Sequence, residues 1–108
     1  HTRSRDRNLG MGKLHIMKVG QRGFYMYNMS GLMNYYYKFK IGNNKVLKFE
    51  KHYRLTPLRE NNRQQYRGQT VDHIHFYRAL KRGRTTLTVY YIQNEKVKFK
   101  DVIVIIVK

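Results

Sequence analysis

Apolar and polar side chains alternate along almost the whole chain from Lys13 onward. A period of two places successive side chains on opposite faces of a strand and does not fit a helix. The segment Val97–Val107 keeps this pattern but changes its phase near Asp101, which predicts a β-bulge there. About seven such segments, separated by turn signals and without an amphipathic helix, predict an all-β, immunoglobulin-like β-sandwich of seven to eight strands.

Two aromatic segments with a short loop between them are the most distinctive part of the chain. Strands are predicted at Phe24–Tyr27 and Tyr35–Ile41, and the loop Ser30–Asn34 between them holds Leu32 and Met33. No neighbouring residue requires this apolar pair to lie in a core. An apolar pair presented between two strands can contact a partner protein. The alternative is that the pair only covers the end of the sandwich.

The length of the chain suits one domain. A chain of 108 residues can form one domain with a core and is too short for two. Residues 1–12 contain arginines and few apolar side chains, so we expect a flexible basic leader before an immunoglobulin-like inhibitor domain at 13–108. The chain begins at His1, which leads us to expect a processed product or an excised domain, with any signal peptide upstream.

The chain is strongly basic and contains no cysteine. Its formal net charge of +17 favours nucleic acid, an anionic membrane or an acidic protein as a partner. The longest apolar run, Val102–Val107, is far shorter than the ~20 residues that span a bilayer, so we expect no membrane insertion. Without cysteine there is no disulfide, thiolate nucleophile or thiolate metal ligand.

The acidic residues give little support to catalysis. General acid–base chemistry needs titratable groups placed together in a pocket. No two carboxylates are close in the sequence, so we expect a protein that is not an enzyme and binds no cofactor. The six carboxylates are those of Asp6, Glu50, Glu60, Asp72, Glu95 and Asp101.

His73 and His75 fall on one face of a predicted strand, a spacing that can hold a metal ion. A metal site also needs a third ligand and supporting hydrogen bonds, and the neighbouring Asp72 points to the opposite face. We therefore expect exposed strand histidines and no metal site.

The basic and aromatic residues leave nucleic-acid binding open as the alternative function. Arginines and lysines could form a positive surface, with tyrosines as stacking platforms for single strands. No nucleic-acid-binding motif is recognisable, and the alternative is a basic β domain of organellar ribosomal type. A third possibility is a secreted immunoglobulin-like module with a structural role. The basic set is Arg54, Arg59, Arg63, Arg67, Arg78, Lys81, Arg82 and Arg84, and the tyrosines are Tyr36, Tyr53, Tyr66 and Tyr77.

A turn, a strand, a loop and a second strand follow one another between Val19 and Phe39. The turn is Val19-Gly20, Tyr37 stands two residues after the loop, and the loop reads Ser30-Gly31-Leu32-Met33-Asn34-Tyr35. This order resembles the chagasin-type inhibitors of papain-like cysteine proteases. In that family a Val-Gly turn leads to a strand, an Asn-Pro-Thr-Thr-Gly-aromatic loop, and a Trp two residues after the aromatic.

Two later segments correspond approximately to the other two loops of the same family. Its second, glycine-rich loop corresponds to Arg67-Gly68-Gln69-Thr70 and its third to Gln93-Asn94-Glu95. The resemblance covers Lys13–Lys108. The family's Pro and both Thr in the first loop, and its Arg and Trp in the third, are absent here. Together with the bias toward Lys, Asn and Tyr, this resembles the malaria-parasite, falstatin-like branch of the family.

The resemblance implies a function and a site. Members of the family insert three loops at one end of the sandwich into the active-site cleft of the protease. Here Leu32 and Met33 would be the apolar anchors near the catalytic centre, and Gly31 and Asn34 would allow the tight backbone between them. The implied partner is a cathepsin- or falcipain-like protease. We expect this chain to be a monomer before it binds and to lie in a secreted or vesicular location. Release into a host cell is a further expectation.

Overall fold

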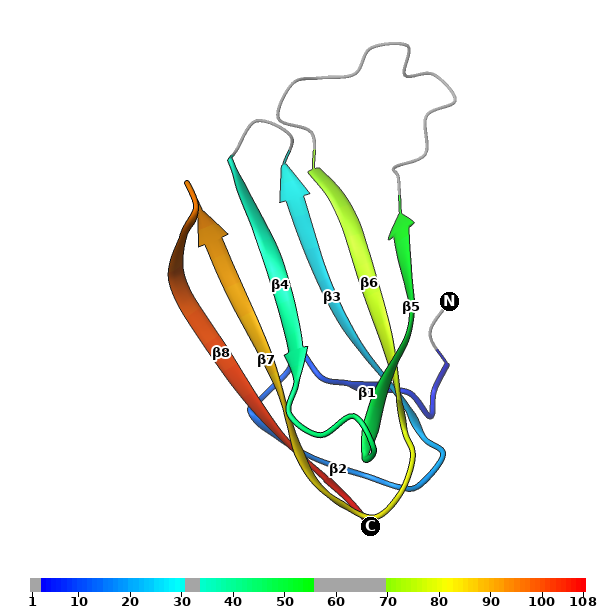
Figure 1. The fold of residues 1–108 in the computed structure, drawn as a ribbon. Helices are drawn as coiled ribbons and strands as arrows, with labels where there is room; N and C mark the ends of the chain where they lie inside the picture. Colours follow the sequence, from blue (N-terminus) through cyan, green and yellow to red (C-terminus); the bar gives the residue numbers. More distant parts are fainter. Residues whose placement is uncertain (1–2, 31–33, 56–69) are drawn as a thin grey trace, which may run out of the picture.

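The computed structural model describes residues 3–30, 34–55 and 70–108. Within these ranges the chain forms eight strands and no helix, in two four-stranded sheets with the orders β1-β3-β6-β5 and β2-β8-β7-β4 (Figure 1). This confirms the predicted all-β sandwich. No helix in the described ranges has the length and apolarity needed to cross a bilayer. The strands are β1 Arg7–Asn8, β2 Leu14–Met17, β3 Arg22–Ser30, β4 Tyr35–Ile41, β5 Leu47–Leu55, β6 Thr70–Ala79, β7 Gly83–Gln93 and β8 Lys96–Val107.

The register of the strands defines two ends of the sandwich. Strands β3 and β6 pair antiparallel from Arg22 opposite Arg78 to Ser30 opposite Thr70. Strands β4 and β7 likewise end with Tyr35 opposite Gln93. The connections β3–β4, β5–β6 and β7–β8 therefore leave from one end, which we call the loop end. The C-terminus and the β6–β7 turn lie at the other end (Figure 1).

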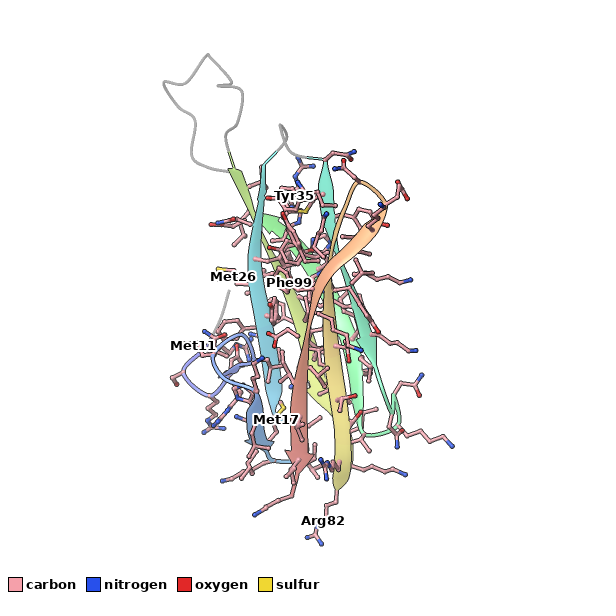
Figure 2. The ribbon with its side chains drawn as sticks, turned by 90° about the vertical axis from the view of Figure 1, so that its left-hand side faces the viewer. Met11, Met17, Met26, Tyr35, Arg82 and Phe99 are labelled. Carbon is pink, nitrogen blue, oxygen red and sulfur yellow. The ribbon has the colours of Figure 1, made fainter. Side chains whose placement is uncertain are left out.

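The core between the sheets differs from one end to the other. Toward the end opposite the loop end it is aliphatic, and Met17 lies there (Figure 2). Met17, Leu87 and Ile105 have no exposed surface. Toward the loop end the core is aromatic, and Tyr37 and Phe39 of β4 pack against it. Every second residue of β4 is exposed, as the alternation predicted.

The expected flexible leader is corrected at residues 7–9. Arg7–Asn8 pairs in parallel with Gly23–Phe24 of β3, and the Leu9 amide donates to the Phe24 carbonyl oxygen at 2.7 Å. Leu9 has no exposed surface. A Cβ at Gly23 would lie 2.9 Å from Leu9 Cδ1, so a side chain there would displace the buried Leu9. This part of the leader belongs to the sandwich.

The β-bulge predicted near Asp101 lies elsewhere. The register of β7 and β8 shifts between Tyr91 and Ile92, whose partners on β8 are Phe99 and Val97. Asp101 stands directly opposite the buried Val89, so it occupies a core-side position of the sheet. Its carboxylate forms an ion pair with Lys13 Nζ at 3.0 Å. The change of phase in the sequence therefore reflects a charged residue on the core side.

Candidate functional site

The loop end brings together the strand ends that flank the three predicted loops (Figure 1). Ser30, which ends β3, pairs with Thr70, which begins β6, so the first and second predicted loops start from neighbouring backbone. Tyr35, at the start of β4, pairs with Gln93, at the end of β7, which sets the first loop beside the third. The two sheets thus place all three connections at one end of the molecule.

The structure locates seven of the predicted site residues. Ser30 and Thr70 are paired strand ends, and Asn34 and Tyr35 stand beside the turn at Gln93-Asn94-Glu95. The remaining predicted site residues lie outside the described residues. These are Gly31, Leu32 and Met33 of the first loop and Arg67, Gly68 and Gln69 of the second.

The third predicted loop is a tight hairpin turn between β7 and β8. Gln93 pairs with Lys96, and the two residues between them have positive φ, 55° at Asn94 and 66° at Glu95. Positive φ at both central positions is the geometry of a type I′ turn, which suits the right-handed twist of the flanking strands. Asparagine is among the residues that accept this conformation most readily, so the sequence signal for a turn here is confirmed.

A pair of asparagines joins the first and third predicted loops. The side-chain amide of Asn34 donates to Asn94 Oδ1 at 3.0 Å, and the backbone amide of Asn94 donates to the Asn34 carbonyl oxygen at 3.2 Å. Because Asn34 precedes β4 and Asn94 follows β7, these bonds fix the positions of the two connections relative to each other. No local pattern in the sequence reports a contact between residues 60 positions apart.

Aromatic side chains support this end from below. The Tyr35 and Tyr91 rings lie 5.2 Å apart, and Tyr91 stacks on Phe99 with ring centroids 5.0 Å apart (Figure 2). Tyr27 of the facing sheet lies 4.8 Å from the Tyr37 ring. Ring pairs at such distances add to the stability that burial alone gives. The loops are therefore carried by a rigid platform.

The strand histidines are not the exposed residues that the sequence predicted. His73 and His75 are half-buried on the face of β6 that carries the core residues Tyr77 and Ala79. His75 Nε2 lies 3.1 Å from the Tyr27 hydroxyl, and His75 Nδ1 lies 3.1 Å from the Tyr77 hydroxyl. A neutral imidazole donates one of these hydrogen bonds and accepts the other. Ile74 and Phe76, on the opposite face, are also buried, so both faces of β6 are covered.

These histidines lie close together, and burial favours the neutral form of His73 and His75. His52 Nε2 lies 2.8 Å from His73 Nδ1, so one of the two rings donates to the other. Burial, with His52 and His73 nearby, lowers the pKa of His75 from 6.5 to about 4. Burial and the neighbouring His52 also lower the pKa of His73. Across the described ranges, no group of three or more His, Cys, Asp or Glu side chains is placed to hold a metal ion.

The low pKa of His75 predicts that acid destabilises the sandwich. The unfolded chain takes up a proton near pH 6.5, whereas the folded chain resists it down to about pH 4, so stability is lost as the pH falls through this window. We expect the free energy of unfolding to fall by on the order of 2 kcal/mol. This is less than the full pKa shift would give, because solvent still reaches the His75 ring and screens its charge. Urea unfolding at a series of pH values measures it.

A matched variant isolates this contribution. His75→Gln keeps groups that can hydrogen-bond but cannot titrate, so its stability should depend less on pH across the same window. His15 and His73, whose pKa values burial also lowers, leave a residual slope of the same sign. Equal pH dependence in the variant and the parent chain would show that His75 is not held neutral.

Among the described residues, the members predicted for the nucleic-acid surface are separated from one another. Tyr77 is 1% exposed and belongs to the core, so it cannot stack on a base. Arg54 pairs with His73 near the loop end, while Arg78 pairs with Arg22 at the opposite end of the same sheet. Arg78 also donates to Glu50 and to the Gly20 carbonyl oxygen, both at 2.9 Å. Four members of the set lie outside the described residues: Arg59, Arg63, Tyr66 and Arg67.

Comparison with known proteins identifies the fold. No protein-family model and no curated protein sequence matches the chain. Among solved structures, the chain is similar to the cysteine protease inhibitor EhICP2 from Entamoeba histolytica, with a TM-score of 0.72, 7% identity, and 96% of this chain and 95% of that chain covered. It is also similar to the solution structure of amebosin, with a TM-score of 0.66, 6% identity, and 95% and 96% covered.

These similarities extend over nearly the whole length of each chain, while the identity is too low to trace individual residues. They confirm the fold that the sequence resemblance implied, and membership of a falstatin-like branch stays a prediction. The chain therefore has the sandwich fold of a solved cysteine protease inhibitor, from its N-terminal β1 to its C-terminal β8.

Proposed function

We propose that this chain is a reversible, competitive inhibitor of papain-like (clan CA) cysteine proteases and has no catalytic activity of its own. The observation that carries the proposal is the meeting of three connections at one end of a fold shared with EhICP2. The loop end would enter the active-site cleft of a cathepsin- or falcipain-like enzyme. The chain would act as a monomer in a secreted or vesicular compartment.

The first loop supplies the central contact in this proposal. Leu32 and Met33 are apolar anchors for the cleft near the catalytic cysteine, and Met adapts its unbranched side chain to irregular pockets. Gly31 and Asn34 permit a tight backbone that presents no scissile bond in a productive position. The second loop, Arg67–Thr70, and the third, Gln93–Glu95, contact the two walls of the cleft.

The supports beneath the loop end would lower the free-energy cost of docking for the first and third loops. Association costs free energy wherever flexible groups become ordered. Here the β7–β8 turn is a two-residue hairpin, and Asn34 and Asn94 connect it to the start of β4. Tyr35, Tyr91 and Phe99 pack below. Little ordering is left for the moment of docking at these positions.

The asparagine pair gives a direct test of this rigidity. Asn34→Ala removes the side-chain hydrogen bond to Asn94. We expect the inhibition constant to rise about tenfold, because one hydrogen bond is lost and the freed loop must be ordered on binding. Asn44→Ala, in the exposed turn before β5, serves as the matched control and should leave inhibition unchanged. If both variants inhibit like the parent chain, the pair does not position the loops.

Steady-state kinetics tests the mode of inhibition. With a papain-like protease and a fluorogenic peptide, the chain should raise the apparent KM and leave kcat unchanged, because substrate and inhibitor compete for one cleft. Activity should return on dilution, and the chain should be recovered uncleaved. A lowered kcat with unchanged KM, or progressive cleavage of the chain, would contradict the proposal.

A further inference from the structure

The end of the sandwich away from the loops carries a hollow of about 1330 Å³. It is bounded by the segment at residues 3–7, the β2–β3 turn and the end of β6. The Gln21 side-chain amide donates to the Arg5 carbonyl oxygen at 2.8 Å, and Arg78 donates to the Gly20 carbonyl oxygen at 2.9 Å. These bonds hold the three segments together, so the hollow is part of the folded structure.

Cationic side chains dominate this hollow. Asp6 is the one carboxylate among the described residues that line it, and it forms an ion pair with Arg22 at 2.7 Å. Arg78 is likewise paired with Glu50. The other cations of the hollow are exposed, and Arg82 lies at the same end of the molecule (Figure 2). The six cationic residues that line it are Arg3, Arg5, Arg7, Lys18, Arg22 and Arg78.

Apolar side chains are exposed in the same hollow. Ile16 and Val19 line it together with the arginines, and they are 47% and 51% exposed. Leu14, two residues before Ile16 on the same face of β2, is 58% exposed. We call the exposed part of this surface the cationic pole, defined by Arg3, Arg5, Arg7, Ile16, Lys18 and Val19.

The combination of exposed cations with exposed apolar side chains favours one class of anionic partner over another. A polyanion in solution gains from the cations but gains nothing from exposed Ile16 and Val19, whereas a bilayer interface receives apolar side chains and attracts cations at once. None of the described residues that line the hollow is aromatic, so it lacks the stacking surface that single-stranded nucleic acid uses. The observations favour a lipid surface.

We propose that the cationic pole docks the protein peripherally on an anionic phospholipid bilayer. Arginines and lysine contact the headgroups, and Ile16 and Val19 enter the interface without any segment spanning the membrane. The loop end is at the opposite end of β3 and β6, so it faces away from the bilayer when the pole is docked. The docked protein keeps its loops accessible to a partner in solution.

Co-sedimentation of the full chain with lipid vesicles tests the proposal. The chain should bind phosphatidylcholine vesicles that contain about 30 mol % phosphatidylserine, bind pure phosphatidylcholine far less, and lose binding as salt rises. Each cation near the surface changes partitioning about fivefold, so the triple variant Arg3→Ala, Arg5→Ala, Lys18→Ala should bind about a hundredfold less. All three side chains are exposed, and thermal melting checks that the fold is kept.

Two controls separate this site from net charge and from polyanion binding. Lys38→Ala, Lys40→Ala, Lys98→Ala removes the same charge from exposed positions of β4 and β8 and should lower vesicle binding less than about fivefold. Ile16→Thr with Val19→Thr should lower vesicle binding about tenfold and leave heparin binding unchanged. Equal losses in the two triple variants, or a Thr pair that binds vesicles like the parent chain, would overturn the proposal. The assay contains no protease, so its outcome is independent of the proposed inhibition.

Discussion

Replacing Leu32 and Met33 together by Asp is expected to raise the inhibition constant against a papain-like protease at least about a hundredfold. Two apolar anchors buried at the centre of an interface contribute about 1.5–3 kcal/mol each, and a carboxylate in the same place adds a desolvation cost. The melting temperature should stay nearly unchanged. The measurement is a titration of protease activity with each variant, beside a thermal melt.

The same double variant separates the inhibitory role from the alternative in which the pair covers the end of the sandwich. A large loss of stability on Leu32→Asp with Met33→Asp would support that covering role. Met11→Asp, at a position 72% exposed near the N-terminus, is the control for an added negative charge. It should change neither inhibition nor melting.

Leu9→Ala is expected to lower the free energy of unfolding by about 3 kcal/mol, the usual effect of deleting a fully buried leucine side chain. Leu9 has no exposed surface, and a Cβ at Gly23 would meet it and the Met17 side chain within 3.2 Å. Urea unfolding of the two proteins measures the difference.

Met11→Ala is the matched control for this prediction. Met11 stands two residues away and is 72% exposed, so its truncation should change stability by less than about 0.5 kcal/mol. If Leu9→Ala were as mild as Met11→Ala, the N-terminal segment would be the flexible leader that the sequence suggested, and β1 would contribute nothing to the sandwich.

Most of the fold could be predicted because it follows from local periodicity. The alternation at Tyr35–Ile41 and at Leu87–Tyr91 is the alternation that the structure shows, with core residues every second position. The turn at Asn94 was also predictable, because the residues that accept positive φ are few. These features depend on neighbours in the sequence.

The features that the sequence did not reveal depend on distant partners. Leu9 is one apolar residue in a basic segment, and only its parallel pairing beside β3 buries it. Both faces of β6 are covered, with the Arg22 guanidinium 4.1 Å from the centre of the Phe76 ring on one of them. Alternation alone therefore could not assign His75 to the core side.

The candidate site likewise has parts that the sequence predicted and parts that depend on distant partners. The sequence predicted which segments form the three loops, and the register of the strands brings their flanking residues to one end. The contact between Asn34 and Asn94 joins residues on different strands, so no motif predicted it. The cationic pole combines the first residues with the β2–β3 turn and the end of β6, and it too exists only in the folded chain.

The most direct test of the central proposal is the titration of a papain-like protease with the unmodified chain, followed by the hydrolysis of a fluorogenic peptide. We predict that activity falls with each addition and is abolished near equimolar chain when the protease is well above the inhibition constant. Unchanged hydrolysis at micromolar concentrations of the folded chain, across several papain-like enzymes, would contradict the proposal that this fold serves protease inhibition here.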